Sequence, residues 1–91
     1  MPDIRRLIFD EWNEERIARH GVTPEEVREA CESHPLVRRG RTNRLTVYGR
    51  ASSGRYLLVV LEPPAGGAFY VVTARDMNRS ERRRYTGARS R

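Results

Sequence analysis

The stretch that decides the fold is Phe69–Tyr85, which reads FYVVTARDMNRSERRRY. Its first six residues are almost all β-branched or aromatic. Such a run is typical of a strand that is buried on one face or on both. We therefore predict an interior strand over 69–74, with Arg75 standing at its exit.

The second half of this stretch predicts a short basic helix. Asn78 has the side chain of a helix cap, and Glu81 is spaced to reach back to the Asn78 backbone N–H. The helix continues with Arg82, Arg83, Arg84 and Tyr85. Because this junction gathers arginines from a strand and a helix, we take it as the candidate site.

Two more strands are predicted upstream, over Leu45–Arg50 and Arg55–Leu61. Short turns rich in glycine, serine and proline connect them to each other and to the strand at 69–74, which predicts an antiparallel meander. The segment Leu36–Arg44 reads as a short strand and a loop.

Alternation in the first of these strands separates apolar side chains from basic and aromatic ones. Leu45 and Val47 face the core, so Arg44, Tyr48 and Arg50 fall on the opposite face. We expect that face to stay open. Arginine beside tyrosine on an open sheet suits single-stranded RNA, because cations bind phosphates and rings stack on unpaired bases.

The N-terminal third predicts an edge strand and a helical hairpin. The strand covers Ile4–Phe9, and the first helix covers Glu11–His20 with Trp12 and Ile17 as its apolar anchors.

The second helix begins at Thr23, whose hydroxyl can cap it together with Glu26, and it stops before Pro35. Its predicted buried stripe is Val27, Ala30, Cys31 and His34. On this stripe Cys31 serves packing rather than nucleophilic chemistry.

Length and composition favour one domain over 1–91, with an ordered core at 4–85 and a frayed tail at 86–91. A single cysteine excludes an intrachain disulfide and a cysteine-based zinc site. No apolar run approaches the roughly 20 residues of a membrane span. The first residues lack the apolar segment of a secretory signal, so we expect a soluble, cytoplasmic protein.

Charge is distributed unevenly. All 18 basic residues are arginine. Residues 1–34 hold five arginines against nine acids, a net charge of −4, whereas residues 35–91 hold thirteen against three, a net charge of +10. This asymmetry predicts a polyanionic partner. Two alternatives stay open: a codon preference for arginine, and an ordinary solvated face.

Two groups of motifs resemble the BrnT toxins and occur in the same order. The first is Asp10-Glu11 ahead of a helix and Arg19-His20-Gly21 before the second helix. The second is Gly54-Arg55-Tyr56-Leu57 leading a strand, Thr73-Ala74-Arg75 at a strand end, then Glu81-Arg82 and Tyr85. The resemblance covers most of the chain, from Phe9 to Tyr85.

The resemblance implies an α+β, RelE-like fold in which a helical hairpin packs on an antiparallel sheet, followed by a short basic C-terminal helix. It implies a type II toxin that cleaves RNA without a metal or other cofactor. The implied partner is a BrnA-type antitoxin with a ribbon-helix-helix part, through which the complex binds operator DNA. The catalytic positions carried over are Arg50, Arg75, Glu81 and Arg82.

The remaining candidates are assigned to RNA binding or left open. The expected RNA-binding residues are Arg44, Tyr48, Arg55, Arg79, Arg83 and Tyr85. His20 is either the general base or a structural group at a helix end. Arg75 can instead pair with a neighbouring carboxylate, and Tyr85 can be a core ring. A binding module without catalysis is therefore the alternative function.

Overall fold

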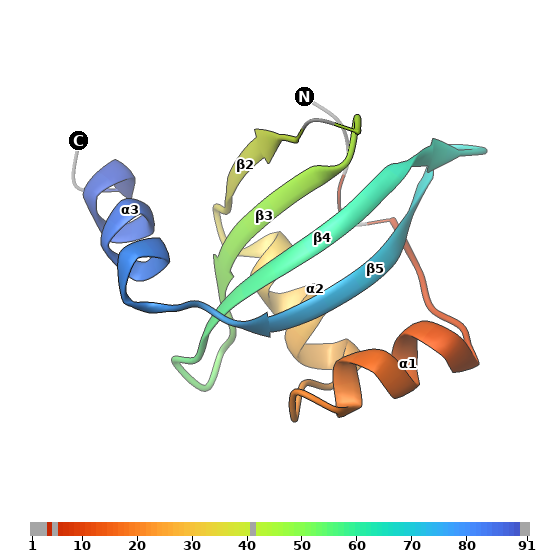
Figure 1. The fold of residues 1–91 in the computed structure, drawn as a ribbon, viewed down its shortest axis with the longest axis horizontal. Coiled ribbons are helices and arrows are strands. Elements are labelled where there is room, and N and C mark those ends of the chain that lie inside the picture. The colour runs from red at the N-terminus through yellow and green to blue at the C-terminus, as the bar shows by residue number, and fades with distance from the viewer. Residues whose placement is uncertain (1–3, 5, 41, 90–91) are drawn as a thin grey trace.

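The computed structural model describes residues 4, 6–40 and 42–89. A five-stranded mixed sheet forms the centre of the molecule, with helices on both faces (Figure 1). Across the sheet the strands are β1 (Leu7–Ile8), β5 (Ala68–Asp76), β4 (Tyr56–Ala65), β3 (Leu45–Arg50) and β2 (Leu36–Arg39). The predicted α+β class is confirmed.

β5 is the interior strand that its composition predicts, since β1 and β4 flank it. β1 runs parallel to β5, with Leu7 opposite Phe69. The sheet is therefore mixed, and the prediction of a wholly antiparallel sheet is wrong. A strand of two residues carries too little pattern to reveal its direction.

The predicted antiparallel meander of β3, β4 and β5 is confirmed. β4 continues to Ala65, beyond its predicted end at Leu61, and register shifts in this part of the ladder accommodate the prolines there. The turn into β5 contains Gly66 and Gly67 at φ of 65° and 83°, a conformation that favours glycine.

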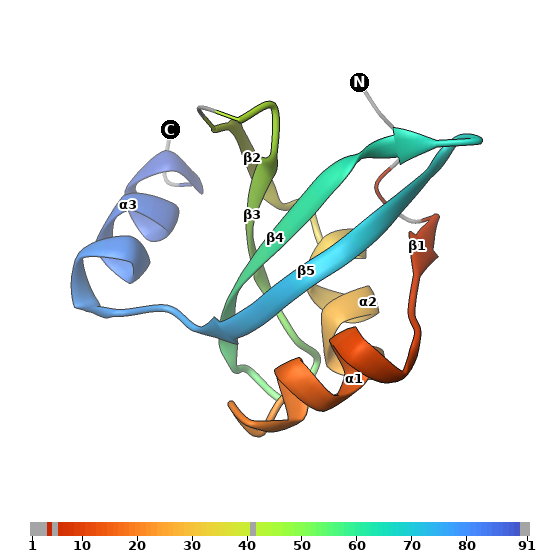
Figure 2. The ribbon, with the colours of Figure 1, turned by 45° about the vertical axis from the view of Figure 1, so that its right-hand side comes forward.

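Helices α1 (Glu11–Ala18) and α2 (Pro24–Glu32) cover one face of the sheet (Figure 2). Both begin at capping boxes, as at Thr23 and Glu26. Asn13 completes the box of α1 and is buried, and its Nδ2 donates to the Ile8 carbonyl at 2.9 Å. The main core lies between these helices and the sheet.

Two side chains of the helical hairpin are not where we predict them. Trp12 is 76% exposed, so Ile17 alone is the buried apolar anchor of α1. His34 lies beyond the end of α2 with φ of 47° and is exposed, so it is not part of the buried stripe. Cys31 is buried on that stripe, as predicted.

α2 lies directly on the backbone of β3. A Cβ added at Gly49 would collide with the carbonyl oxygen of Ala30. Glycine at this position is therefore required by the helix-to-sheet distance.

Helix α3 (Arg79–Arg89) packs on the opposite face of the sheet. It forms a second, smaller core of Tyr48, Leu58, Met77 and Tyr85. The predicted open face is thus partly covered. The helix also extends past its predicted end at Tyr85, and residues 86–89 are helical; the rest of the predicted frayed tail lies outside the described residues.

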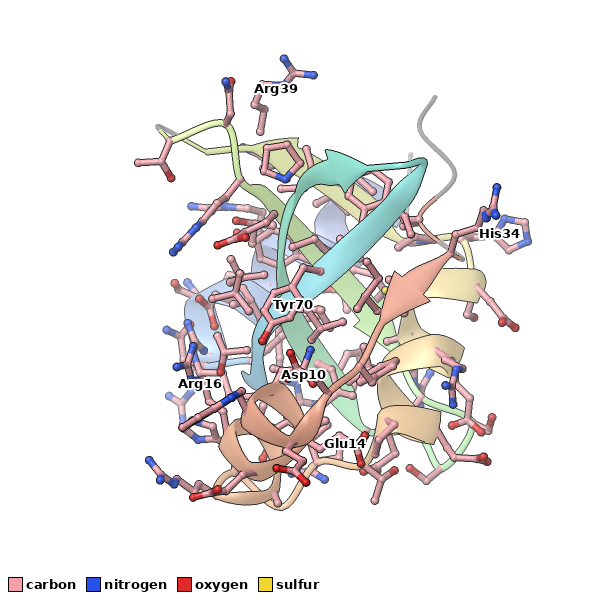
Figure 3. All side chains as sticks on the ribbon, turned by 90° about the vertical axis from the view of Figure 1, so that its right-hand side faces the viewer. Asp10, Glu14, Arg16, His34, Arg39 and Tyr70 are labelled. Carbon is pink, nitrogen blue, oxygen red and sulfur yellow. The ribbon has the colours of Figure 1, made fainter. Side chains whose placement is uncertain are left out.

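Polar contacts tie the hairpin to the sheet at its other edge. Tyr70 on β5 donates its hydroxyl to Asp10 at 3.1 Å, and Figure 3 shows the two side chains facing each other. Arg16 donates to the Val72 carbonyl at 3.1 Å. None of the described helices combines the length and apolar character that a membrane crossing needs.

Candidate nucleic-acid interface

Arg50 and Arg82 meet at the ring of Tyr56. The guanidinium carbon of Arg50 lies 4.9 Å from the ring centroid, and that of Arg82 lies 4.3 Å from it. Arg50 is the last residue of β3 and stands opposite Tyr56 in the β3–β4 ladder. Arg82 comes from α3, so three separate elements build this cluster, which we call the arginine–tyrosine cluster.

The two guanidiniums of the cluster keep their positive charge exposed. Among the described residues, no carboxylate forms an ion pair with Arg50 or Arg82. The Arg50 Nε donates to the Gly54 carbonyl at 3.2 Å, which leaves its terminal nitrogens available. Two positive groups that the protein itself does not neutralise attract an anionic ligand.

Two open pockets meet at Gly54 beside this cluster. The pocket that Arg82 lines has a volume of about 320 Å³ and is bounded by Gly54, Arg55, Tyr56, Asp76, Met77 and Arg82. The pocket that Arg50 lines has a volume of about 620 Å³ and is bounded by Glu29, Glu32, Ser33, Arg50, Ala51, Ser52, Ser53 and Gly54. The cluster therefore borders open space on which an extended ligand can lie.

Tyr85 packs α3 against the buried side of the cluster. Its ring meets the ring of Tyr56 edge to face, with the centroids 5.9 Å apart and an interplanar angle of 78°. Tyr85 is only 3% exposed, so it is a core residue. The expectation that Tyr85 contacts RNA is at odds with this burial, because α3 presses the ring against the sheet.

Arg75, the predicted strand-end arginine, is paired within the chain. Its two terminal nitrogens donate to the two carboxylate oxygens of Glu81 at 2.8 and 2.9 Å, and Nη1 also reaches the Asp76 carbonyl at 3.0 Å. The hydrogen bonds to Glu81 raise the pKa of Arg75. The alternative interpretation of Arg75 as an ion-pair partner is therefore the one that the geometry bears out.

Glu81 has two structural roles, as the cap of α3 and as the partner of Arg75. It caps α3 by accepting from the Asn78 N–H at 2.8 Å, while the Glu81 N–H donates to the Asn78 side chain at 2.9 Å. This confirms the predicted capping box. Hydrogen bonds from Arg75 lower the pKa of Glu81, so its carboxylate stays ionised and is a weak base.

Arg55 is a structural tie and not an exposed cation. Its guanidinium donates to both oxygens of Asp76, at 2.6 and 3.0 Å, and to the carbonyls of His20 and Gly21, at 2.9 and 2.6 Å. A further ion pair joins it to Glu26 at 3.3 Å. The expectation that Arg55 binds RNA fails geometrically, because every donor group already has a partner within the chain.

Tyr48 lies on the sheet face predicted for it, opposite the main core, but it is not exposed there. It is 5% exposed beneath α3, and its hydroxyl accepts from Arg84 at 3.2 Å. Its ring cannot stack on a base while α3 is docked. The α3 residues Arg79 and Arg83 are exposed, as an RNA-binding role requires. Arg44 is half-exposed and forms an ion pair with Glu62 at 3.3 Å.

His20 lies at the same end of the molecule as the cluster. It is exposed just beyond α1, and its backbone carbonyl accepts from the Arg55 guanidinium, which also donates to Asp76. Because Arg55 and Asp76 both line the smaller pocket, the backbone of His20 lies close to that pocket. Figure 3 shows the other histidine, His34, projecting outward beyond the end of α2.

Tyr56, which together with Arg55 was one of two alternatives for the open sheet face, is absent from the predicted site residues, although the signal for it is present in the sequence. A two-strand register that pairs the end of β3 with the start of β4 puts Arg50 opposite Tyr56. Cross-strand neighbours interact directly, so the pair was within reach of sequence reasoning. The contact between Arg82 and Tyr56 could not be predicted in this way, since it depends on where α3 docks.

Within the described residues no group of three or more histidine, cysteine, aspartate or glutamate side chains is arranged to hold a metal ion. No protein-family model matches the chain, and no curated protein matches it.

Proposed function

We propose that the protein is a metal-independent endoribonuclease that acts on single-stranded RNA and serves as the toxin of a type II toxin–antitoxin pair. The observation that carries the proposal is the arginine–tyrosine cluster, in which Arg50 and Arg82 share a ring and have no carboxylate partner among the described residues. The exposed Arg79 and Arg83 extend this positive surface along α3.

The chemistry follows from what metal-free RNA cleavage needs. The ribose 2′-OH gives up its proton and attacks the adjacent phosphorus, and the bond to the 5′-oxygen breaks, which leaves a 2′,3′-cyclic phosphate and a 5′-hydroxyl protonated from water. Negative charge builds on the phosphoryl oxygens during attack, and fixed cations lower that barrier. Arg50 and Arg82 supply these cations, and holding the phosphate between them aligns the attacking hydroxyl.

In this scheme Arg75 and Glu81 are positioning residues. Their two-point ion pair holds the exit of β5 against the first turn of α3, which carries Arg82. We assign the proton transfer from the 2′-OH to His20, because it is exposed and its backbone carbonyl binds Arg55, which lines the smaller pocket, whereas Glu81 is a poor base. Imidazole is well suited to proton transfer near neutral pH.

The fold fits the same proposal. A helical hairpin packed on one sheet face and a short basic C-terminal helix are two features expected of a RelE-like toxin. The proposed partner is a BrnA-type antitoxin whose acidic segment covers the cluster and whose ribbon-helix-helix part binds operator DNA. A cytoplasmic location follows from the RNA substrate.

The test is cleavage of a single-stranded RNA by the purified protein in EDTA. The expected products end in 2′,3′-cyclic phosphate, and a 2′-O-methyl RNA of the same sequence stays intact because it has no attacking hydroxyl. The variant His20→Gln should lose activity and retain RNA binding. Cleavage of the 2′-O-methyl RNA, or no cleavage of either RNA, would reject the nuclease proposal.

A second function is favoured by one specific observation. Arg75 and Glu81, two of the four catalytic positions that the resemblance implies, bind each other through two hydrogen bonds. A basic module that binds RNA or an acidic antitoxin without catalysis would need only the exposed arginines. RNA binding without any cleavage, in protein that causes no growth arrest when expressed alone, identifies this second function.

A further inference from the structure

The arginines of this protein are held in place in two different ways. Arg44, Arg55 and Arg75 are each paired with at least one carboxylate. Arg50 and Arg82 lie against the Tyr56 ring instead, and Arg50 also donates to the Gly54 carbonyl. At the Tyr56 ring the chain thus uses an aromatic partner for two guanidiniums.

The choice of partner decides whether an arginine can still bind a phosphate. A carboxylate cancels the charge of a guanidinium and occupies its N–H donors. The face of an aromatic ring attracts the cation through the ring quadrupole, carries no net charge and uses none of these donors. Arg50 and Arg82 are therefore oriented and still fully charged.

Tyr56 is itself fixed firmly enough to serve as this support. Its backbone lies in the β3–β4 ladder opposite Arg50, and its carbonyl accepts from the Met77 N–H at 3.0 Å. The edge contact with the buried Tyr85 fixes the angle of the ring. Arg82 and Tyr85 are three residues apart on α3, so the docking of one places the other.

We propose that Tyr56 is a positioning residue that holds Arg50 and Arg82 at one ring so that the pair binds the phosphates of an RNA strand. Phosphate as the ligand rests on the proposed function, whereas the role of the ring is new. Because both arginines already lie against the ring, Tyr56 does not stack on a base. Its hydroxyl forms no hydrogen bond among the described residues and is dispensable.

The test measures binding of a fluorescein-labelled 2′-O-methyl RNA by anisotropy, so cleavage plays no part. Tyr56→Phe keeps the ring and Tyr56→Leu removes it. Phe9→Leu is the matched control, because Phe9 carries the guanidinium of Arg28 at 4.9 Å on the helical side of the molecule. Melting curves show that each variant is folded at the assay temperature.

We expect Tyr56→Phe and Phe9→Leu to bind within about twofold of the parent chain. Tyr56→Leu should bind roughly 5- to 30-fold more weakly, because two cation–π contacts that orient the arginines are lost. The slope of log affinity against log salt should also become shallower, by about 0.7 for each phosphate contact that is lost. Unchanged affinity of Tyr56→Leu overturns the proposal.

The same substitution in the Arg50→Gln/Arg82→Gln background separates positioning from direct contact. If the ring acts through the arginines, Tyr56→Leu has almost no further effect there. An equal loss in both backgrounds means that the ring touches RNA or only supports the fold, and it overturns the positioning role.

A measurement on the unchanged chain covers the case in which Tyr56→Leu does not fold. In NMR spectra the side-chain N–H signals of Arg50 and Arg82 should carry ring-current shifts and should move together when the 2′-O-methyl RNA is added. Unmoved signals at saturating RNA overturn the proposal. Failure of the nuclease proposal gives a different result. An RNA with free 2′-OH groups then stays intact, while Tyr56→Leu still weakens RNA binding.

Discussion

Replacement of Arg55 by methionine tests the structural role of this arginine. Methionine keeps much of the apolar stem and removes the guanidinium, which binds the end of α1, Asp76 and Glu26 together. The side chain is only 24% exposed, so these bonds are partly shielded from water. We predict a clear loss of stability, although sequence reasoning assigns Arg55 to the ligand-binding surface.

The size of the loss follows from the contacts. Asp76 is 59% exposed, so solvent screens that ion pair and its contribution is well below about 1 kcal/mol. The charged hydrogen bonds to the His20 and Gly21 carbonyls contribute about 1–1.5 kcal/mol each, since water can reach these carbonyls after the change. The total is about 2–3 kcal/mol, which corresponds to a melting temperature lower by roughly 10–20 °C in a domain of this size.

Thermal melting followed by circular dichroism at 222 nm measures this loss. Arg44→Met is the matched control, because the Arg44–Glu62 pair has both side chains 46% exposed. It should cost less than about 0.5 kcal/mol. Equal melting temperatures for Arg55→Met and Arg44→Met would refute the assignment of Arg55 as a structural tie.

Three further predictions concern acid stability, thiol reactivity and helix packing. Because Arg75 lowers the pKa of Glu81, this carboxylate contributes stability that is present above its ordinary pKa of 4.5 and is lost as the pH falls through the lower folded value. Glu81→Gln should therefore cost about 1 kcal/mol near neutral pH and almost nothing once the pH is low enough to protonate the folded carboxylate, as urea unfolding at each pH will show; a cost independent of pH contradicts the ion pair. Burial raises the pKa of Cys31 to about 12, so an aromatic disulfide reagent should modify it at the rate of unfolding, and rapid modification of the folded protein would contradict its burial. Gly49→Ala should destabilise the protein by about 2 kcal/mol or more through collision with Ala30, and a neutral effect in the same urea assay would contradict the close approach of α2.

Local signals in the sequence predicted much of the fold. The capping pairs Thr23–Glu26 and Asn78–Glu81 form as expected, because both partners lie within one helical turn. The composition of β5 also identified an interior strand. These features depend on neighbours in the chain, which is why sequence reasoning reaches them.

The candidate site was harder to predict because it depends on contacts between distant elements. The docking of α3 decides that Tyr48 is buried and that Arg82 lies over Tyr56. An arginine rich in donors looks the same in sequence whether it is exposed or bound by acids. The pairing of Arg55 with residues of three other segments could therefore not be seen before the fold was known.

The most direct test of the central claim compares two double variants that remove the same charge. Arg50→Gln/Arg82→Gln empties the arginine–tyrosine cluster, whereas Arg38→Gln/Arg39→Gln removes two exposed arginines from the edge strand β2. In a metal-free cleavage assay on single-stranded RNA, we predict that the first pair lowers the rate by at least about 100-fold and the second by no more than about threefold. Equal losses in the two double variants would contradict the account, because RNA would then respond only to overall charge.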